Sequence, residues 1–181
     1  MKHNYLETNL LKIKRLADIR EDENYRFRAF LKGKDFDKID KIVHRLHDEI
    51  TQQIDCTLCG NCCIQLKAKL EKEEIAVLAR LEDISPENYQ DSYCEKDGPD
   101  LFLKDMPCRY LEEKKCSIFE NRPNECKQFP YTRKERFISR LFGMLNFYEL
   151  CPIVFNLMER LKAETRFRRK DFNIYVGNRT L

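Results

Sequence analysis

Residues 56–63 hold four cysteines within eight positions and read Cys56-Thr57-Leu58-Cys59-Gly60-Asn61-Cys62-Cys63. The step Cys-x-x-Cys, which lets two thiolates reach one metal ion from a tight turn, occurs here twice in succession. Gly60 and Asn61 both tolerate a positive φ, so we expect the backbone to turn its amides toward the sulfur atoms. The stretch therefore predicts a metal site around which the rest of the chain is organised.

Cys62 and Cys63 are adjacent, and adjacent side chains point in different directions on a helix or a strand. We therefore do not expect both to bind the same mononuclear ion: either they serve two centres, or one of them is a buried or bridging thiol. Buried cysteines that pack as small apolar side chains, or a disulfide framework, are the simpler interpretations. The metal-ligand spacing argues against the first, and the lack of a signal-like apolar segment at the start of the sequence argues against the second.

Composition indicates one domain with a core of its own, since 181 residues suffice for that without help from disulfides. Nine cysteines are many for a chain expected in the cytoplasm, where thiols stay reduced and cysteine clusters indicate metal or redox chemistry. We expect no membrane segment, because no apolar run approaches ~20 residues. The 34 basic and 31 acidic residues alternate along the chain with a net charge of +3, which gives no reason to expect nucleic-acid binding.

Apolar periodicity predicts a mostly α-helical protein with a small β-hairpin, an α+β fold in a single compact domain organised around cysteine-ligated metal. The expected helices are residues 5–19, 36–54 and 71–82, with two more beginning at Ser85-Pro86 and Cys151-Pro152. We expect a hairpin near residues 101–118 whose tip is the polar run 112–115. Residues 137–150 are core material of uncertain type. His44 and His47, on the second helix, are interpreted as surface histidines rather than metal ligands.

We divide the chain into an N-terminal helical segment packed on the core, a cysteine-cluster metal-binding core and a basic C-terminal tail. The boundaries are 1–53, 54–162 and 163–181. The basic residues of the tail include Arg166, Arg168, Arg169 and Lys170, and a solvated tail is the commoner interpretation of such a run.

A second group of cysteines follows the first. Cys108 and Cys116 flank the predicted hairpin tip, so the hairpin should bring them together. Arg122-Pro123 indicates a turn or a helix start, and Cys126 follows three residues later.

With Cys151-Pro152, these elements resemble the CxxCxxCC cysteine-cluster family, also called the YkgJ family, over about residues 54–162. The motifs that carry the resemblance are Cys56-x-x-Cys59-Gly-Asn-Cys62-Cys63 and Cys116-Ser-Ile-Phe-Glu-Asn-Arg122-Pro123-Asn-Glu-Cys126. The family is described as zinc- or iron-chelating, is often labelled iron–sulfur oxidoreductase, and has relatives that act as protein lysine methylases. The usual Cys-Arg pair is Cys126-Lys127 here, which keeps the charge but loses the bidentate fork.

The resemblance implies a metal centre held by eight cysteines: Cys56, Cys59, Cys62, Cys63, Cys108, Cys116, Cys126 and Cys151. Cys94 falls outside the pattern and is interpreted as a structural or free thiol. Eight thiols suit two four-cysteine sites, or one iron–sulfur cluster with a second site or with spare thiols. A thiolate centre is negatively charged, and Arg122 and Lys127, with Arg109, are the nearest cations in sequence to balance it; an ion pair of Arg122 with Glu120 or Glu125 is the alternative.

We favour an iron–sulfur centre of [4Fe–4S] type over zinc, because Cys-x-x-Cys-x-x-Cys is the ferredoxin spacing. Three functions remain open: a redox or carrier protein, an iron–sulfur enzyme, or a structural zinc module for an unknown protein partner. No catalytic residue is predicted, because no Ser/His/Asp set, phosphate-binding glycine loop or paired carboxylates is visible. An oxidoreductase activity rests on the family label alone.

Overall fold

Helix α3 (Phe36–Thr51) is the long amphipathic helix that the sequence predicts over residues 36–54. It begins after Asp35, whose side chain accepts a 3.0 Å hydrogen bond from the amide of Lys38 and so caps the first turn. The structure is a computed structural model that describes residues 5–168. The helix ends at Thr51, and the following turn leads through the buried Ile54 into the first cysteine group.

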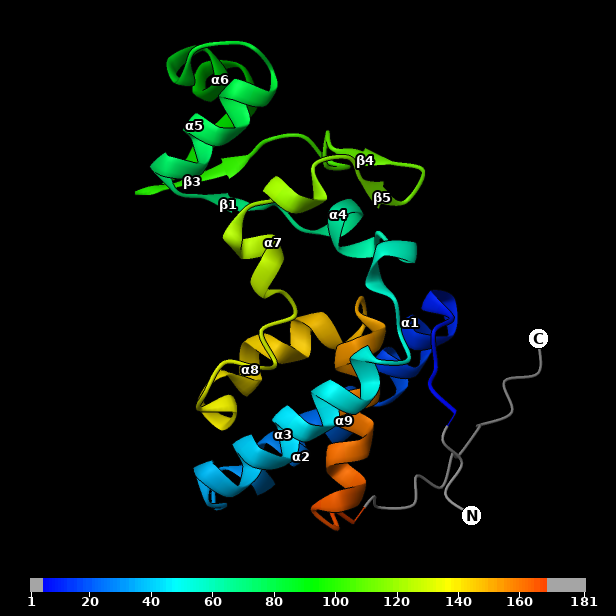
Figure 1. Ribbon diagram of the computed structural model, residues 1–181. Helices are drawn as coiled ribbons and strands as arrows, with labels where there is room; N and C mark the ends of the chain where they lie inside the picture. Colours follow the sequence, from blue (N-terminus) through cyan, green and yellow to red (C-terminus); the bar gives the residue numbers. More distant parts are fainter. Residues whose placement is uncertain (1–4, 169–181) are drawn as a thin grey trace, which may run out of the picture.

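Five helices pack around the larger of two hydrophobic cores (Figure 1). They are α1 (Leu10–Ile19), α2 (Glu21–Leu31), α3, α8 (Phe137–Tyr148) and α9 (Pro152–Glu164). Helix α3 contacts both α8 and α9, so helices from the two ends of the chain share one core. Residues 137–150, whose type the sequence left uncertain, thus form mainly helix α8, because their apolar side chains face α3 and α9.

A buried ionic network joins α2, α8 and α9 inside this bundle. Lys162 is 1% exposed, and its Nζ lies 2.7 Å from the carboxylate of Glu23 and 2.8 Å from that of Glu159. Glu159 also accepts hydrogen bonds from Arg20, at 2.6 Å, and from the hydroxyl of Tyr148, at 2.7 Å. A buried ammonium requires such partners, because leaving it unpaired costs several kcal/mol.

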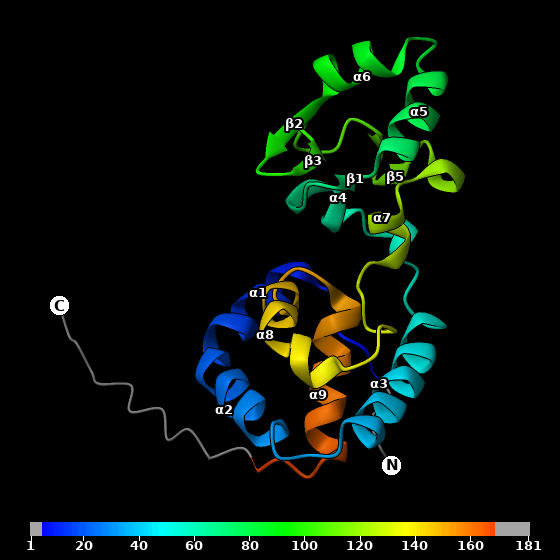
Figure 2. The same ribbon diagram turned by 90° about the vertical axis from the view of Figure 1, so that its left-hand side faces the viewer.

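The middle of the chain forms a separate group of elements above the bundle (Figure 2). Its helices are α4 (Asn61–Gln65), α5 (Lys72–Leu81), α6 (Pro86–Tyr93) and α7 (Asn124–Gln128), with the 3₁₀ turns η1 (Cys56–Leu58) and η2 (Phe119–Asn121). Ser85 caps α6 as predicted, and its hydroxyl accepts a hydrogen bond from the amide of Asn88. A smaller core lies under α5 and α6, where the hydroxyls of Tyr89 and Tyr110 hydrogen-bond at 2.8 Å.

Two small antiparallel sheets complete this group, and they correct the single predicted hairpin over 101–118. A three-stranded sheet has the order β1–β3–β2, and a separate two-stranded hairpin is β4–β5. The strands are β1 (Lys69–Leu70), β2 (Cys94–Asp97), β3 (Asp100–Leu103), β4 (Leu111–Glu112) and β5 (Lys115–Cys116). Strand β3 therefore pairs with the distant β1 and with β2, whereas the predicted tip at 112–115 does form the turn of β4–β5.

The structure confirms a mostly helical α+β fold in one domain. The first helix begins later than predicted: α1 starts after Asn9, because the Asn9 side chain accepts a hydrogen bond from the amide of Lys12 and residues 5–9 stay outside the helix. Within residues 5–168 no helix is both long and apolar enough to cross a membrane. Residues 1–4 of the N-terminal segment and residues 169–181 of the basic tail, with Arg169 and Lys170, lie outside the described residues.

Candidate metal centre

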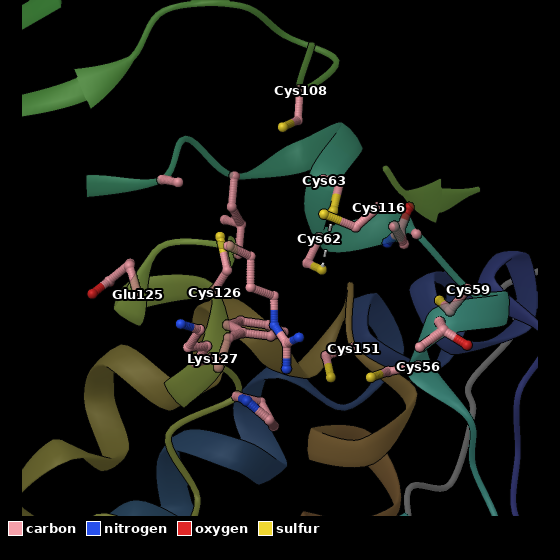
Figure 3. Close-up of a pocket in the computed structure, with 18 of the residues that line it drawn as sticks. Cys56, Cys59, Cys62, Cys63, Cys108, Cys116, Glu125, Cys126, Lys127 and Cys151 are labelled. Carbon is pink, nitrogen blue, oxygen red and sulfur yellow. Dashed lines mark hydrogen bonds between the residues drawn. The ribbon is translucent and has the colours of Figure 1, made fainter. Parts of the chain in front are cut away.

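A cavity of about 580 Å³ is lined by residues of both the helical bundle and the smaller group of elements. All nine cysteines lie within the described residues as free thiols, and eight of them line this cavity (Figure 3). The lining set is Cys56, Cys59, Cys62, Cys63, Cys108, Cys116, Cys126 and Cys151. Cys94 instead packs beside the smaller core, at the start of β2.

The first cysteine group is a tight double turn. The carboxylate of Asp55 accepts a 2.8 Å hydrogen bond from the amide of Thr57, and the amide of Cys59 then donates to the carbonyl oxygen of Cys56 at 3.1 Å. Gly60 follows with φ +63°, and a Cβ there would lie 2.8 Å from the backbone oxygen of Lys114. Glycine is therefore required both by the left-handed backbone and by the close approach of the β4–β5 turn.

Asn61 behaves differently from expectation. Asn61 is the first residue of α4, and its backbone is helical; only Gly60 of the pair has a positive φ. Its side-chain amide donates a 2.7 Å hydrogen bond to the carbonyl oxygen of Leu150. That bond ties the first cysteine group to the residue preceding Cys151, which is 6% exposed and belongs to the larger core.

The second cysteine group meets the first through the backbone. The amide of Cys108 donates a 2.7 Å hydrogen bond to the carbonyl oxygen of Cys63, and the amide of Leu111 donates to the carbonyl oxygen of Cys108 at 2.9 Å. Leu111 in turn pairs with Cys116 across the β4–β5 hairpin. A continuous chain of backbone contacts therefore connects Cys63, Cys108 and Cys116.

Cys126 reaches the cavity from α7, a helix of five residues. The preceding Arg122-Pro123 adopts extended backbone, and Asn124 opens α7 with its amide donating a 2.6 Å hydrogen bond to the carboxylate of Glu74 on α5. This anchor places Cys126 across the cavity from the β4–β5 hairpin (Figure 3).

The electrostatics of the thiols reveal which of them are neighbours. The pKa of Cys126 is raised to about 12, mainly by burial and also by the nearby thiols of Cys63, Cys108 and Cys116. The pKa of Cys151 is likewise raised to about 12, mainly by burial. The thiols of Cys59 and Cys56 act in the same direction, and hydrogen bonds from the backbone amides of Val154 and Ile153 oppose the rise.

The cysteines thus fall into two neighbourhoods, with Cys63, Cys108, Cys116 and Cys126 in one and Cys56, Cys59 and Cys151 in the other (Figure 3).

Cys62 lies between these neighbourhoods in Figure 3. Its sulfur is 3.9 Å from that of Cys63, and this thiol–thiol hydrogen bond is the largest cause of the raised pKa of Cys63, ahead of burial. The adjacent pair is therefore the point at which the two neighbourhoods meet.

Arg122 and Lys127, the predicted balancing cations, both line the cavity. Burial raises the pKa of Cys56 and of Cys116, and the guanidinium of Arg122 opposes the rise in both. The side chain of Arg122 donates a 2.6 Å hydrogen bond to the carbonyl oxygen of Phe119 and stacks on the aromatic ring of the same residue. These two contacts fix the position of its guanidinium.

Arg109, the third cation considered, does not line the cavity. Its guanidinium stacks on Tyr93 at 3.3 Å and pairs with Glu82 at 3.3 Å and Asp105 at 3.8 Å, so its charge is used within the smaller group of elements.

Two further residues of the cavity wall were missed by sequence reasoning. His47, interpreted as a surface residue, is half-buried, and its Nδ1 lies 2.6 Å from the hydroxyl of Thr132. Burial lowers the pKa of His47, with the nearby Arg133 acting in the same direction. Arg133 also lines the cavity and forms an ion pair with Asp48. The position of His47 at the edge of the apolar stripe of α3 could have indicated that it is partly buried, whereas no local pattern indicates Arg133.

The donor set suits a thiophilic metal, because eight sulfur donors surround one cavity and several cations, Arg122, Lys127 and Arg133 among them, lie in its wall. Among residues 5–168, no three His, Cys, Asp or Glu side chains already stand close enough together to hold a metal ion. The thiols line the cavity walls, and ligation would have to draw them toward a common centre.

Fold and cavity together define a mostly helical domain with a cysteine cluster around one cavity. Residues 55–142 match the model of the CxxCxxCC family, described as a putative zinc- or iron-chelating domain, so this part of the chain is similar to that family. Of the eight cavity cysteines, only Cys151 lies beyond the matched segment. No curated protein and no solved structure shows a significant match to the chain.

Proposed function

We propose that this protein is an iron–sulfur redox or carrier protein whose [4Fe–4S]-type centre is held by Cys56, Cys59, Cys62 and Cys151. The observation that carries the proposal is the place of Cys151. Ferredoxin-type clusters take three ligands from a Cys-x-x-Cys-x-x-Cys run and a fourth from a distant cysteine, here followed by Pro152. Cys151 is remote in sequence and yet adjoins Cys56 and Cys59 across the Asn61–Leu150 hydrogen bond.

The surroundings of these thiols support a buried redox centre. Cys151 lies in the apolar core, which keeps water away from one side, while Arg122 brings positive charge to Cys56. Burial, charge and hydrogen bonds around the sulfur atoms are what set the reduction potential of such clusters. When bound, the cluster supplies one-electron chemistry; the chain supplies ligands, charge balance and exclusion of solvent. Free thiols suit a reducing compartment, and we place the protein in the cytoplasm.

A structural zinc function is the second candidate, and the Cys62–Cys63 distance favours it. Two sulfurs bound tetrahedrally at ~2.3 Å from one zinc ion lie about 3.8 Å apart, close to the observed 3.9 Å. In that case both adjacent thiols would serve one ion, contrary to expectation from their side-chain directions.

Anaerobic purification of the full chain, with iron, sulfide and zinc analysis, separates the two candidates. We expect iron and sulfide in equal amounts, a brown colour, and an electron paramagnetic resonance signal that appears or disappears on reduction. Cys59→Ser should remove iron and colour, whereas the matched control Cys94→Ser should keep both, because Cys94 lies outside the cavity. A colourless wild-type protein, replete with zinc and free of sulfide, would contradict the iron–sulfur proposal.

A further inference from the structure

We propose that the cavity also binds a small organic molecule, an aromatic carboxylate whose rings lie against Phe129 and Tyr131 and whose carboxylate is held by Arg122 and Lys127. This ligand lies beside the cysteine centre and not within it. The proposal therefore goes beyond the proposed function, and it holds whichever metal the cysteines bind.

The cavity has the size and the lining of a small-molecule site. Its volume of about 580 Å³ falls in the range of roughly 300–1,000 Å³ that is typical of such sites, whose walls are mostly apolar and aromatic with a few polar groups. Besides the cysteines, the wall contains the rings of Phe119, Phe129 and Tyr131 and aliphatic side chains such as Leu66 and Ile153. These side chains cannot bind a metal, but they offer a surface to an organic molecule.

The carboxylates of the wall are already engaged. Within the described residues only Asp105 and Glu125 line the cavity as acids. Asp105 pairs with Arg109 at 3.8 Å, and Glu125 accepts a 2.5 Å hydrogen bond from the hydroxyl of Tyr131. The carboxylate of Glu125 points away from the sulfur atoms (Figure 3). The charge that remains at the wall is therefore positive.

More cations line the cavity than one metal centre needs. Of the five lysines and arginines in the wall, two form ion pairs with acids outside it. The other three, Lys114, Arg122 and Lys127, form no ion pair within residues 5–168. A divalent ion with four thiolates carries a net charge of about −2, so positive charge is left for a further anion. Arg122, fixed against Phe119, presents a guanidinium that suits a carboxylate.

Tyr131 is held in a strained conformation at this wall. Its φ is +60°, in the left-handed region that is unfavourable for a bulky side chain. Its amide donates to the carbonyl oxygen of Gln128 at 2.8 Å, its carbonyl oxygen accepts from Arg140 at 3.0 Å, and its hydroxyl is bound by Glu125. Strained residues that are fixed in this way are concentrated at ligand-binding sites.

The rings of Phe129 and Tyr131 define the shape of the ligand. Their centroids lie 5.6 Å apart and their planes meet at 86°, so together they form a corner of the cavity. A flat ring placed in this corner stacks on one side chain and meets the other edge-on, which are the two favoured aromatic arrangements.

His47 supplies a polar group on the same side of the chain. Its Nδ1 lies 2.6 Å from the hydroxyl of the fully buried Thr132, which fixes the ring, and its Nε2 forms no hydrogen bond within the described residues. A carboxylate fits these groups better than a phosphate does. Phosphate sites use backbone amides at glycine-rich loops and helix N-termini, whereas this wall offers side-chain cations and aromatic rings.

Equilibrium dialysis of 4-benzoylbenzoate against the anaerobically purified full-length protein tests the proposal, with the uncharged 4-benzoylbenzamide as the matched ligand. We expect about one benzoylbenzoate per chain and binding of the amide that is weaker by about tenfold or more, because the amide lacks the charge that pairs with the cations. Irradiation should attach the bound benzophenone to cavity residues, which mass spectrometry maps. Equal binding of acid and amide, or attachment outside the cavity, would overturn the proposal.

Two variants and one control locate the carboxylate. Arg122→Gln and Lys127→Gln should each weaken benzoylbenzoate binding by about tenfold and leave binding of the amide unchanged. Lys115→Gln is the control, because Lys115 is exposed and does not line the cavity. Wild-type affinity in both cavity variants would contradict the assignment of the two cations.

The same titration before and after metal removal separates a ligand site from charge balance alone. Binding by the metal-loaded protein supports the proposal. Binding that appears only after the metal is stripped, and is lost on reloading, would mean that the cations serve the centre and would overturn it. Absence of iron from the purified protein would count against the proposed redox function and would leave the ligand-binding results as they are.

Discussion

The amide of Cys108 donates a 2.7 Å hydrogen bond to the carbonyl oxygen of Cys63, so the two cysteine groups of the chain are joined through the backbone before any metal is considered. Cys63 lies on α4, and Cys108 lies in the segment between β3 and β4. Strand β5 also contacts η1, so the β4–β5 hairpin lies against the first cysteine group. We call this contact between Cys63 and Cys108 the junction of the two cysteine groups.

Gly60→Ala should destabilise the junction. The left-handed backbone costs a non-glycine residue about 1–2 kcal/mol, and the added Cβ would lie 2.8 Å from the backbone oxygen of Lys114, which cannot move aside as a flexible side chain would. We expect a lower midpoint of urea unfolding and a reduced metal content. Gly33→Ala is the matched control: nothing lies within 4 Å of its Cβ position, and the change should stay within about 0.5 kcal/mol. Equal stability of the two variants would contradict the argument.

Lys162→Met should destabilise the helical bundle by about 3–5 kcal/mol, because it leaves the carboxylates of Glu23 and Glu159 without the buried ammonium that both contact. Equilibrium unfolding in urea measures the change. Lys41→Met, at an exposed position of α3, is the control and should shift stability by less than about 0.5 kcal/mol. A loss as small as that of the control would mean that the network contributes little net stability.

Stability should fall on acidification through the titration of Glu159. Burial opposes ionisation of this carboxyl, but the charge of Lys162, hydrogen bonds from Lys162 and Tyr148, and the nearby Arg20 outweigh burial and hold its pKa below the usual value. A lowered pKa contributes stability that is fully present above the unfolded-state pKa and is lost as pH falls through the folded-state pKa. Urea unfolding at successive pH values from about 6 to about 3 should show this loss in wild type and a flatter profile in Glu159→Gln. Identical slopes in the two proteins would disprove the assignment to Glu159.

Asn61→Ala should loosen Cys151 from the first cysteine group. The substitution removes a side-chain hydrogen bond to the carbonyl oxygen of Leu150 and should cost about 1 kcal/mol. We expect a partial loss of iron. The exposed Asn121, changed to Ala, is the control and should leave the iron content unchanged. Unchanged iron content in the Asn61 variant would show that this bond does not position Cys151.

Metal removal should act unevenly on the molecule. Structural zinc contributes ~10–16 kcal/mol in small peptides, and the elements that carry most of the cysteines have little core of their own. Hydrogen exchange of the stripped protein should show lost protection in α4 and α7 and retained protection in α3, α8 and α9, whose core is built from aliphatic and aromatic side chains. Uniform loss of protection, or none, would contradict a local structural role of the metal.

Local sequence signals predicted the elements whose causes are local. The apolar stripe and Asp35 predicted α3, Ser85-Pro86 predicted the start of α6, and the charged run 112–115 predicted the β4–β5 turn. The pairing of β3 with β1 and β2 was not predicted, because strands as short as these carry no register information and their partners are distant in the chain.

The sequence by itself determined the chemistry available to this protein: eight matched cysteines, the Cys-x-x-Cys steps and the cations near them, since donor type and short-range spacing are covalent facts. Only the tertiary structure decided which thiols are neighbours. The bonds Asn61–Leu150 and Cys108–Cys63 bring Cys151 and Cys108 to the first cysteine group. The contacts His47–Thr132 and Arg133–Asp48 place His47 and Arg133 in a cavity wall where no motif predicts them. Such proximity arises from packing and hydrogen bonds between elements distant in sequence, which spacing along the chain cannot encode.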